Sequence, residues 1–292
     1  MMDEARYGAL REVVENHLLR VTREEWGGIP HPLRDAMAYS LLSGGKRLRP
    51  VLLLAAHELI APWDGAALRF AGALEMIHTY SLIHDDLPAM DNDTLRRGKP
   101  TCHVVYGEGM AVLAGDGLLN LAMEEMLSSD HPGTLAAARA VAGAAGVRGM
   151  IAGQCLDLAH EGQEPSPELV SSIHRLKTAC LLTAPMEAGL ILAGAGEGQL
   201  AAGSAFGRLF GLAFQIRDDL LDRTGSEAAL GKHTGKDTAE GKLTWPALYG
   251  EEQARADVAR LTEEACGRLR EAFGDKADFL CGIAQECVQR NH

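Results

Sequence analysis

Residues 68–91 read LRFAGALEMIHTYSLIHDDLPAMD, and this stretch decides how the chain folds. Apolar residues recur at helical spacing over residues 68–83, which predicts an α-helix with a buried face. Pro88 cannot continue that helix comfortably and is expected to end it. The carboxylates of Asp85 and Asp86 then lie at the end of an apolar helix. The stretch therefore predicts a helical bundle that carries acidic groups at one end of a helix.

A second acidic run, FQIRDDLLD, occupies residues 214–222 and also ends an apolar segment. Asp218 and Asp222 are four residues apart, so they share a helix face. In the first run, Asp91 follows the proline and can fold back towards Asp85. Oxygen ligands without cysteine or histidine at metal-site spacing favour magnesium or manganese over zinc. One such run alone is more often a solvated helix face, but two facing runs predict a multi-magnesium site for a polyanionic ligand.

The rest of the chain also reads as helices joined by short turns. Helical periodicity extends over residues 10–18, 52–59, 111–127 and 169–192, and glycine and proline mark the breaks. No alternating strand pattern appears, and short connections favour antiparallel packing. The long polar stretch 223–242 predicts a functional or disordered loop. We expect one all-α domain over residues 1–292.

The composition limits the partners and the location. A formal net charge of −12 argues against nucleic acid as the main partner. No segment approaches the roughly 18 uninterrupted apolar residues of a spanning helix, and the N-terminus lacks the order of a signal peptide. We therefore expect a cytoplasmic protein without a membrane span. The six cysteines form no CxxC pairs, so neither a zinc site nor a disulfide framework is indicated.

Basic residues accompany the acidic runs. Residues 44–50 (GGKRLRP) and 96–100 (RRGKP) each gather several cations. Arginine can hold phosphate oxygens with two hydrogen bonds, and lysine supplies a mobile charge. Lys177, Lys232 and Lys242 are further donors, although each taken alone reads better as a solvated surface charge. If these groups converge on the carboxylates, they form a diphosphate-binding surface.

The motifs resemble those of the trans-prenyl diphosphate synthases, the family that includes farnesyl and geranylgeranyl diphosphate synthases. The resemblance covers nearly the whole chain and implies the isoprenoid synthase fold, an antiparallel helix bundle around a deep central cavity, and a homodimer. Its motifs are GGKRLRP (44–50), HTYSLIHDDLPAMDNDTLRRGKPTCH (78–103), GDGLL (115–119), GQCLDL (153–158), LKT (176–178), FQIRDDLLD (214–222), LGKHTGKD (230–237) and QRNH (289–292).

The resemblance also implies roles for single residues. Three magnesium ions, for which Mn²⁺ can substitute, would bridge the allylic diphosphate to Asp85, Asp91 and Asp218. Asp86, Asp219 and Asp222 would support them, with Asp86 and Asp222 as additional candidate ligands. The allylic diphosphate would also be held by Arg96, Lys177, Thr178, Gln215, Lys232 and Lys242, and isopentenyl diphosphate by Lys46, Arg49, His78 and Arg97. The loop from Lys232 to Asp237 is slightly longer than in animal relatives, which leaves the role of Asp237 open.

The implied reaction is the head-to-tail, trans condensation of isopentenyl diphosphate with dimethylallyl or geranyl diphosphate. Oxygen atoms of Lys177, Thr178 and Gln215 would stabilise the transient allylic cation while water is excluded. Proton loss ends each cycle, and the released diphosphate is the expected acceptor.

Product length is expected to depend on Tyr80. It lies five residues before Asp85, more than one helical turn, so its ring can block the growing chain, while the small Ser81 leaves some room. An aromatic residue here, with the Pro88-Ala89 insertion, resembles the bacterial farnesyl type. The alternative within the family is geranylgeranyl diphosphate synthase. A terpene cyclase and a silent regulatory subunit are less favoured, because both acidic runs and the GGKRLRP segment are intact.

Overall fold

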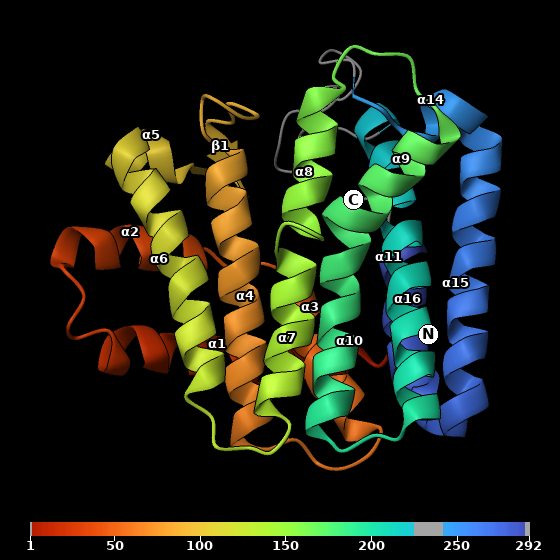
Figure 1. Ribbon diagram of the computed structural model, residues 1–292, viewed down its shortest axis with the longest axis horizontal. Coiled ribbons are helices and arrows are strands. Elements are labelled where there is room, and N and C mark those ends of the chain that lie inside the picture. The colour runs from red at the N-terminus through yellow and green to blue at the C-terminus, as the bar shows by residue number, and fades with distance from the viewer. Residues whose placement is uncertain (1, 225–241, 290–292) are drawn as a thin grey trace.

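The computed structural model describes residues 2–224 and 242–289, and this part of the chain is almost wholly helical (Figure 1). The all-α prediction is thereby confirmed. The helices are α1 (Glu4–Arg20), α2 (His31–Leu41), α3 (Leu48–Glu58), α4 (Gly65–Asp85), α5 (Cys102–Tyr106), α6 (Glu108–Leu127), α7 (Thr134–Ala145), α8 (Met150–Ala159), α9 (Pro167–Ile173), α10 (Cys180–Leu192), α11 (Glu197–Thr224), α14 (Trp245–Tyr249), α15 (Glu251–Phe273) and α16 (Asp278–Gln289). Shorter helical elements are the π-helices η1 (Val21–Glu25) and η2 (His174–Ala179) and the 3₁₀-helix η3 (Gly274–Ala277).

Helix α4 runs through the middle of the bundle and carries the first acidic run (Figure 1). Its N-terminus is capped by Asp64, whose Oδ1 accepts a hydrogen bond of 2.9 Å from the backbone N–H of Ala67. The helix packs against α3 and α6, and its apolar side chains are buried. At its C-terminal end the N–H of Asp91 donates to the carbonyl oxygen of Asp85 at 2.9 Å. The chain after the proline therefore folds back, as the sequence predicted.

Helices α10 and α11 form the opposite wall of the bundle. Helix α10 packs on α3 and α7, and α11 packs on α10 and α15. One buried apolar core connects these elements from α1 to α16, with Phe70, Phe206 and Phe210 among its largest members. Because α11 ends in the second acidic run, this packing brings both runs to the same end of the bundle.

A short hairpin departs from the prediction that the chain has no strand. Strands β1 (Leu95–Arg96) and β2 (Lys99–Pro100) pair antiparallel. Arg97 and Gly98 between them have φ angles of 54° and 73°. Positive φ at both central residues is typical of the two-residue turn that suits a hairpin. Two strand residues are too few to produce an alternating pattern in the sequence.

Arg47 has a different place from its neighbours Lys46 and Arg49, with which the sequence grouped it as a phosphate donor. Its side chain is fully buried, and its guanidinium bonds Glu15 (Nε to Oε1, 2.8 Å) and Glu75 (Nη1 to Oε1, 2.7 Å). A buried cation is tolerated when carboxylates pair it. Arg47 therefore joins α1 to α3 and α4 and is removed from the set of diphosphate donors.

One stretch, Thr134–Ala159, is long and apolar enough to cross a membrane by length and composition, although Arg139 and Arg148 interrupt its apolar residues. Its share of buried residues is 33% in the most apolar window. In the structure the stretch consists of two helices, α7 and α8, with a break at residues 146–149. This is weak evidence for a membrane span, because core helices pass the same test.

Candidate active site

The two acidic runs meet at a cavity of about 280 Å³. Asp85 and Asp91 line it from the end of α4, and Asp218 lines it from α11. The facing cations are Arg96, Lys177 and Lys242. The structure thus brings together carboxylates and basic groups that lie more than 150 residues apart in the sequence. We call this cavity the mouth.

Asp85 is placed where a negative charge is costly. Burial, followed by the nearby Asp91, raises its pKa to about 6, although Lys177 and Arg96 act in the opposite direction. A carboxylate in such surroundings gains by binding a cation. Aspartate oxygens are ligands that magnesium prefers, so the donor set at the mouth fits Mg²⁺.

No three His, Cys, Asp or Glu side chains in the described part of the chain stand close enough to hold a metal ion by themselves. Magnesium is commonly bound by one or two carboxylates together with substrate phosphate oxygens. The arrangement at the mouth therefore fits a metal that arrives with a diphosphate.

The lysines at the mouth are held by carboxylates. Lys177 Nζ lies 2.5 Å from Asp157 Oδ2, and Lys242 Nζ lies 3.3 Å from Asp91 Oδ1. Burial acts to lower the pKa of Lys177, but Asp157 and Asp85 outweigh it and raise the pKa. Lys177 therefore stays charged although it is largely enclosed.

Asp86 and Asp222, which the sequence offered as metal ligands, are not among the residues that line the mouth. Both are buried. Asp86 accepts hydrogen bonds of 2.6 to 2.9 Å from the guanidinium of Arg96. This bidentate pair orients Arg96 towards the mouth from behind. The geometry therefore supports a positioning role for Asp86, and the metal roles of Asp86 and Asp222 stay predictions.

Asp219 lines the mouth but is occupied by hydrogen bonds. Its Oδ1 accepts from Gln215 Nε2 at 2.9 Å, and its Oδ2 accepts from the backbone N–H of Trp245 at 2.8 Å. His174 Nε2 lies 3.2 Å from the same Oδ2. Asp219 therefore joins α11 to η2 and α14, which supports the second acidic run as the sequence suggested.

A cluster of cations adjoins the mouth on the side of α3 and α4. Arg49 and His78 line the second cavity, described below, and Arg97 lies over Gly45, where an added Cβ would meet its Cζ at 2.7 Å. Burial and then Arg97 lower the pKa of Arg49 to about 10. Burial followed by Arg49 holds the pKa of His78 well below its usual value. His78 is therefore neutral, and the positive charge on this side of the cavities comes from Arg49 and Arg97, which suits an anion.

The remaining predicted diphosphate-binding residues differ in where they lie. Arg49 Nε is buried and has no hydrogen-bond partner among the described residues. Lys46 is exposed on the surface, with its carbonyl oxygen bonded by the Tyr7 hydroxyl at 2.7 Å, and it lines neither cavity. Lys232, also expected to bind diphosphate, lies outside the described residues, as does Asp237.

Helix α10 is preceded by the π-helix η2, which contains Lys177 and Thr178. Such local departures from the α-helical ladder occur frequently at functional sites, because they redirect backbone carbonyl groups. Thr178 Oγ1 donates to Gln215 Oε1 at 2.5 Å. The three residues predicted to surround the allylic cation are therefore neighbours in the structure.

Behind the mouth lies a second cavity, of about 570 Å³, that we call the chain cavity. It shares Asp85, Lys177 and Thr178 with the mouth, and Tyr80 and Ser81 line it on α4. Its other walls are largely apolar and come from α6 and α8: Leu119, Met150, Ile151 and Leu158. The Tyr80 ring packs edge-on against His84 with ring centres 5.8 Å apart. The polar mouth and the largely apolar chain cavity are thus joined at these shared residues.

Sequence reasoning missed residues on α8 and α4. Asp157, which holds Lys177, and Gln154, which lines the chain cavity, belong to the quoted GQCLDL segment but received no role. His84 occupies the space beside Gly115, where an added Cβ would lie 2.1 Å from its Nε2. The signal for Asp157 was its i, i+3 spacing from Gln154, since such residues share a helix face.

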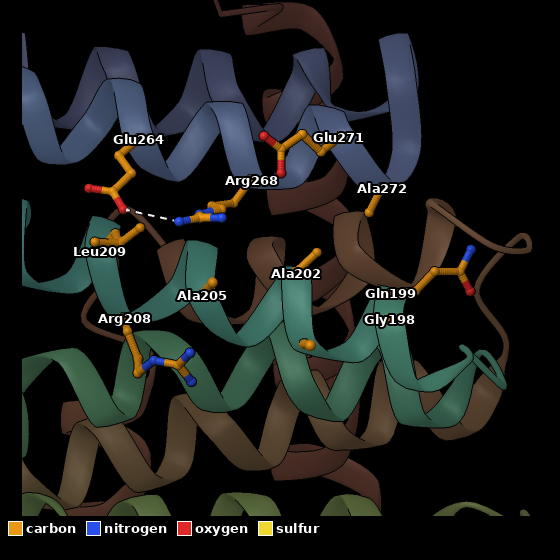
Figure 2. Close-up of a pocket in the computed structure, with 11 residues that line it drawn as sticks. Gly198, Gln199, Ala202, Ala205, Arg208, Leu209, Glu264, Arg268, Glu271 and Ala272 are labelled. Carbon is orange, nitrogen blue, oxygen red and sulfur yellow. Dashed lines mark ion pairs between the residues drawn. The ribbon is translucent and has the colours of Figure 1, made fainter.

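A larger groove of about 810 Å³ lies between α11 and α15 (Figure 2). Small residues such as Ala202 and Ala205 line one side of it, and Arg268 and Glu264 on the other side pair at 3.7 Å. Its charges come from both signs and it contains none of the aspartates of the acidic runs. Size alone therefore does not make it the reaction site.

A diphosphate bound at the mouth would direct its hydrocarbon chain into the chain cavity, and this is the arrangement of a trans-prenyl diphosphate synthase. The polyprenyl synthetase family model matches residues 30–280. The chain belongs to that family, whose members are generally magnesium-dependent.

Similar proteins carry two kinds of name. The chain is 44% identical over 287 residues to the farnesyl diphosphate synthase of Geobacillus stearothermophilus, covering 97% of this chain and 96% of the relative. It is also 44% identical over 269 residues to the heterodimeric geranylgeranyl pyrophosphate synthase large subunit 2 of Arabidopsis thaliana, covering 90% of this chain and 72% of the relative.

Solved structures share the fold. An apo FPP/GFPP synthase from Zymomonas mobilis superposes with a TM-score of 0.85 at 37% identity, covering 97% of this chain and 99% of that one. A geranyltransferase from Helicobacter pylori, complexed with magnesium and isoprenyl diphosphate, superposes with a TM-score of 0.86 at 32% identity, covering 97% of each chain.

Proposed function

We propose that this protein is a farnesyl diphosphate synthase that condenses isopentenyl diphosphate with dimethylallyl or geranyl diphosphate. The observation that carries this proposal is the chain cavity, with Asp85 at one end and the ring of Tyr80 on its wall more than one helical turn away. An aromatic ring at that depth limits how far a product can extend.

The allylic diphosphate is proposed to bind at the mouth. Asp85, Asp91 and Asp218 would hold magnesium, of which three ions are expected, and the metal would offset the charge of the departing diphosphate. Arg96 and Lys177 donate to the same diphosphate, with Lys242 released from Asp91 to join them. Lys232 stays a prediction.

Isopentenyl diphosphate is proposed to bind at the cations Arg49 and Arg97, with the neutral His78 beside them. The unpartnered Nε of Arg49 and the charge of Arg97 nearby support an anion there. Lys46 is exposed beside this cluster and can close over the ligand.

The reaction then follows from these positions. The bond from the allylic carbon to the diphosphate oxygen breaks, and its electron pair leaves with the diphosphate, where Arg96 and Lys177 stabilise the charge. The double bond of isopentenyl diphosphate attacks the allylic cation, and the released diphosphate accepts the proton that the new carbon loses. Thr178 and the η2 backbone exclude water from the cation.

The test is an incubation of the purified protein with magnesium, labelled isopentenyl diphosphate and geranyl diphosphate, with the dephosphorylated products resolved by chain length. Farnesol as the main product is the expected result. Geranylgeraniol would retain the reaction and overturn the proposed length. Absence of product with dimethylallyl, geranyl and farnesyl diphosphate alike would refute the synthase reaction.

Geranylgeranyl diphosphate synthase is the second candidate. The observation that favours it is the equal identity of 44% to a relative of that name, together with the small Ser81 beside Tyr80. The same product analysis separates the two candidates.

The protein is proposed to act in the cytoplasm as a homodimer. Large apolar side chains that are exposed and do not line the chain cavity occur on α5, α6 and α7 and at the break after α7, namely Val104, Val105, Val112, Leu113, Leu127, Leu135 and Val147. An exposed apolar surface of this kind supports a protein interface.

A further inference from the structure

The chain cavity contains a polar group to which the reaction described above gives no role. Gln154, on α8, lines the chain cavity together with Lys177 and Thr178. Its side-chain carbonyl oxygen, Oε1, is buried and has no hydrogen-bond partner among the described residues. Burying a carbonyl oxygen without a hydrogen-bond partner costs folding free energy, which suggests that this oxygen gains a partner when substrate binds.

Gln215, the amide that the sequence assigned to the allylic cation, is engaged elsewhere. Its Oε1 accepts from Thr178 Oγ1 at 2.5 Å, and its Nε2 donates to Asp219 Oδ1 at 2.9 Å. Gln215 also lines the mouth and not the chain cavity. Of the two amides, Gln154 is the one that has an uncommitted carbonyl oxygen and belongs to the lining of the chain cavity.

The position of Gln154 relative to Lys177 is fixed by the backbone. At Gly153, the preceding residue, an added Cβ would lie 2.2 Å from the backbone nitrogen of Lys177, so α8 and η2 touch without a side chain between them. One turn further along α8, Asp157 Oδ2 bonds Lys177 Nζ at 2.5 Å. Gln154 and Asp157 are three residues apart and share that face.

We propose that Gln154 is a catalytic residue whose carbonyl oxygen contacts the allylic carbon as positive charge develops on it. The proposal rests on the proposed function. As the bond from carbon to diphosphate oxygen breaks, the oxygen end of the amide dipole faces the cation, and no bond to Gln154 forms or breaks. A fixed dipole stabilises a charge more strongly in a cavity without water than in solution. The amide returns unchanged when the new carbon–carbon bond forms.

The informative variant is Gln154→Met, which keeps the length of the side chain and removes the carbonyl. Two probes distinguish cation binding from general binding, each with magnesium and measured by calorimetry. One is an ammonium analogue of geranyl diphosphate, which carries a positive charge near the reacting carbon. The other is geranyl thiolodiphosphate, which is neutral at that carbon and does not ionise readily.

We expect the dissociation constant of the ammonium analogue to rise on the order of tenfold in Gln154→Met, while that of the thiolodiphosphate stays within about twofold. The turnover number should fall with little change in KM. Leu156→Met, a substitution on α8 outside the chain cavity, is the matched control and should change neither constant. If Gln154→Met does not fold, Gln154→Asn keeps the amide on a shorter arm and carries the same expectation.

Equal weakening of both probes, or unchanged binding of both, would overturn the role of Gln154 while the synthase reaction stands. Failure of the unsubstituted protein to bind either probe with magnesium would overturn the proposed function and this inference with it.

Discussion

Tyr80 belongs to the buried core and also lines the chain cavity, so one side chain bears on both the fold and the proposed product length. Its ring lines the chain cavity, and its hydroxyl group is buried without a partner in the described part of the chain. Burial, followed by Asp85, raises the pKa of Tyr80 to about 12, so it stays neutral. We therefore expect the ring, and not the hydroxyl, to limit the length of the product.

Tyr80→Ala is expected to shift the product towards twenty carbons or longer, because it removes the ring from the chain cavity. Tyr80→Phe is the matched control, since it removes only an unpartnered hydroxyl and should retain the original product. Chain-length analysis of the two variants measures the shift. An unchanged distribution in Tyr80→Ala would show that another residue limits the chain.

Lys177→Ala is expected to reduce turnover roughly a hundredfold or more without unfolding the protein, because it removes a charge that faces the diphosphate. Circular dichroism and steady-state kinetics check the two parts of this expectation. Asp157→Asn is the companion variant, since it leaves the lysine in place without the carboxylate that orients it. Full activity of Lys177→Ala would remove Lys177 from the reaction.

His17 predicts how stability depends on pH. Burial and then Arg20 lower its pKa to about 4, against 6.5 for the free side chain. Between pH 6.5 and pH 4 the unfolded chain therefore binds a proton at His17 that the folded chain does not bind. The contribution of neutral His17 to the free energy of unfolding is complete above pH 6.5 and declines as the pH falls towards 4. The loss is about 1.4 kcal/mol per pH unit within that window. Urea unfolding at pH 7 and pH 5 should show a shallower decline in His17→Gln than in the unsubstituted chain, and equal slopes would contradict the assignment.

At the scale of elements, α8 and η2 meet in a close backbone contact within the site. Gly153→Ala would force a Cβ against the backbone of Lys177, and overpacking of this kind costs about 1–3 kcal/mol. Thermal unfolding is expected to show that loss together with reduced turnover. Gly143→Ala on the exposed face of α7, where nothing lies within 4 Å, is the control and should stabilise by up to ~1 kcal/mol. Equal effects of the two substitutions would argue against a tight contact.

The sequence was most informative about elements and less so about which side chains face the cavities. Spacing alone predicted the acidic run on α4 and its fold-back at Asp91, because proline and helical periodicity are local signals. Arg47 was wrongly grouped with phosphate donors, since adjacency in a chain does not show that a side chain turns inward to Glu75. Gln154 was missed because a single glutamine on an apolar helix has no pattern of its own.

At the scale of the whole molecule, the exposed apolar side chains of α5, α6 and α7 predict self-association. Leu113 is 54% exposed on α6, and Leu113→Glu should move the protein from dimer towards monomer. Ala247→Glu on α14, which lies across the molecule from α6 (Figure 1), is the control. Analytical ultracentrifugation measures both. A monomeric unsubstituted chain would contradict the proposed homodimer.

The position of Tyr80 also affects how such genes can diverge. The Tyr80 hydroxyl has no hydrogen-bond partner among the described residues, and its ring lines a cavity. A substitution at this position therefore breaks no side-chain hydrogen bond of α4. A duplicated gene could then acquire a new product through one codon, while the remainder of the chain drifts under separate constraints. The equal identity to relatives of both names is what such a history would leave. If Tyr80 limits the product as proposed, the codon at position 80 is a better guide to product than ancestry inferred from whole sequences.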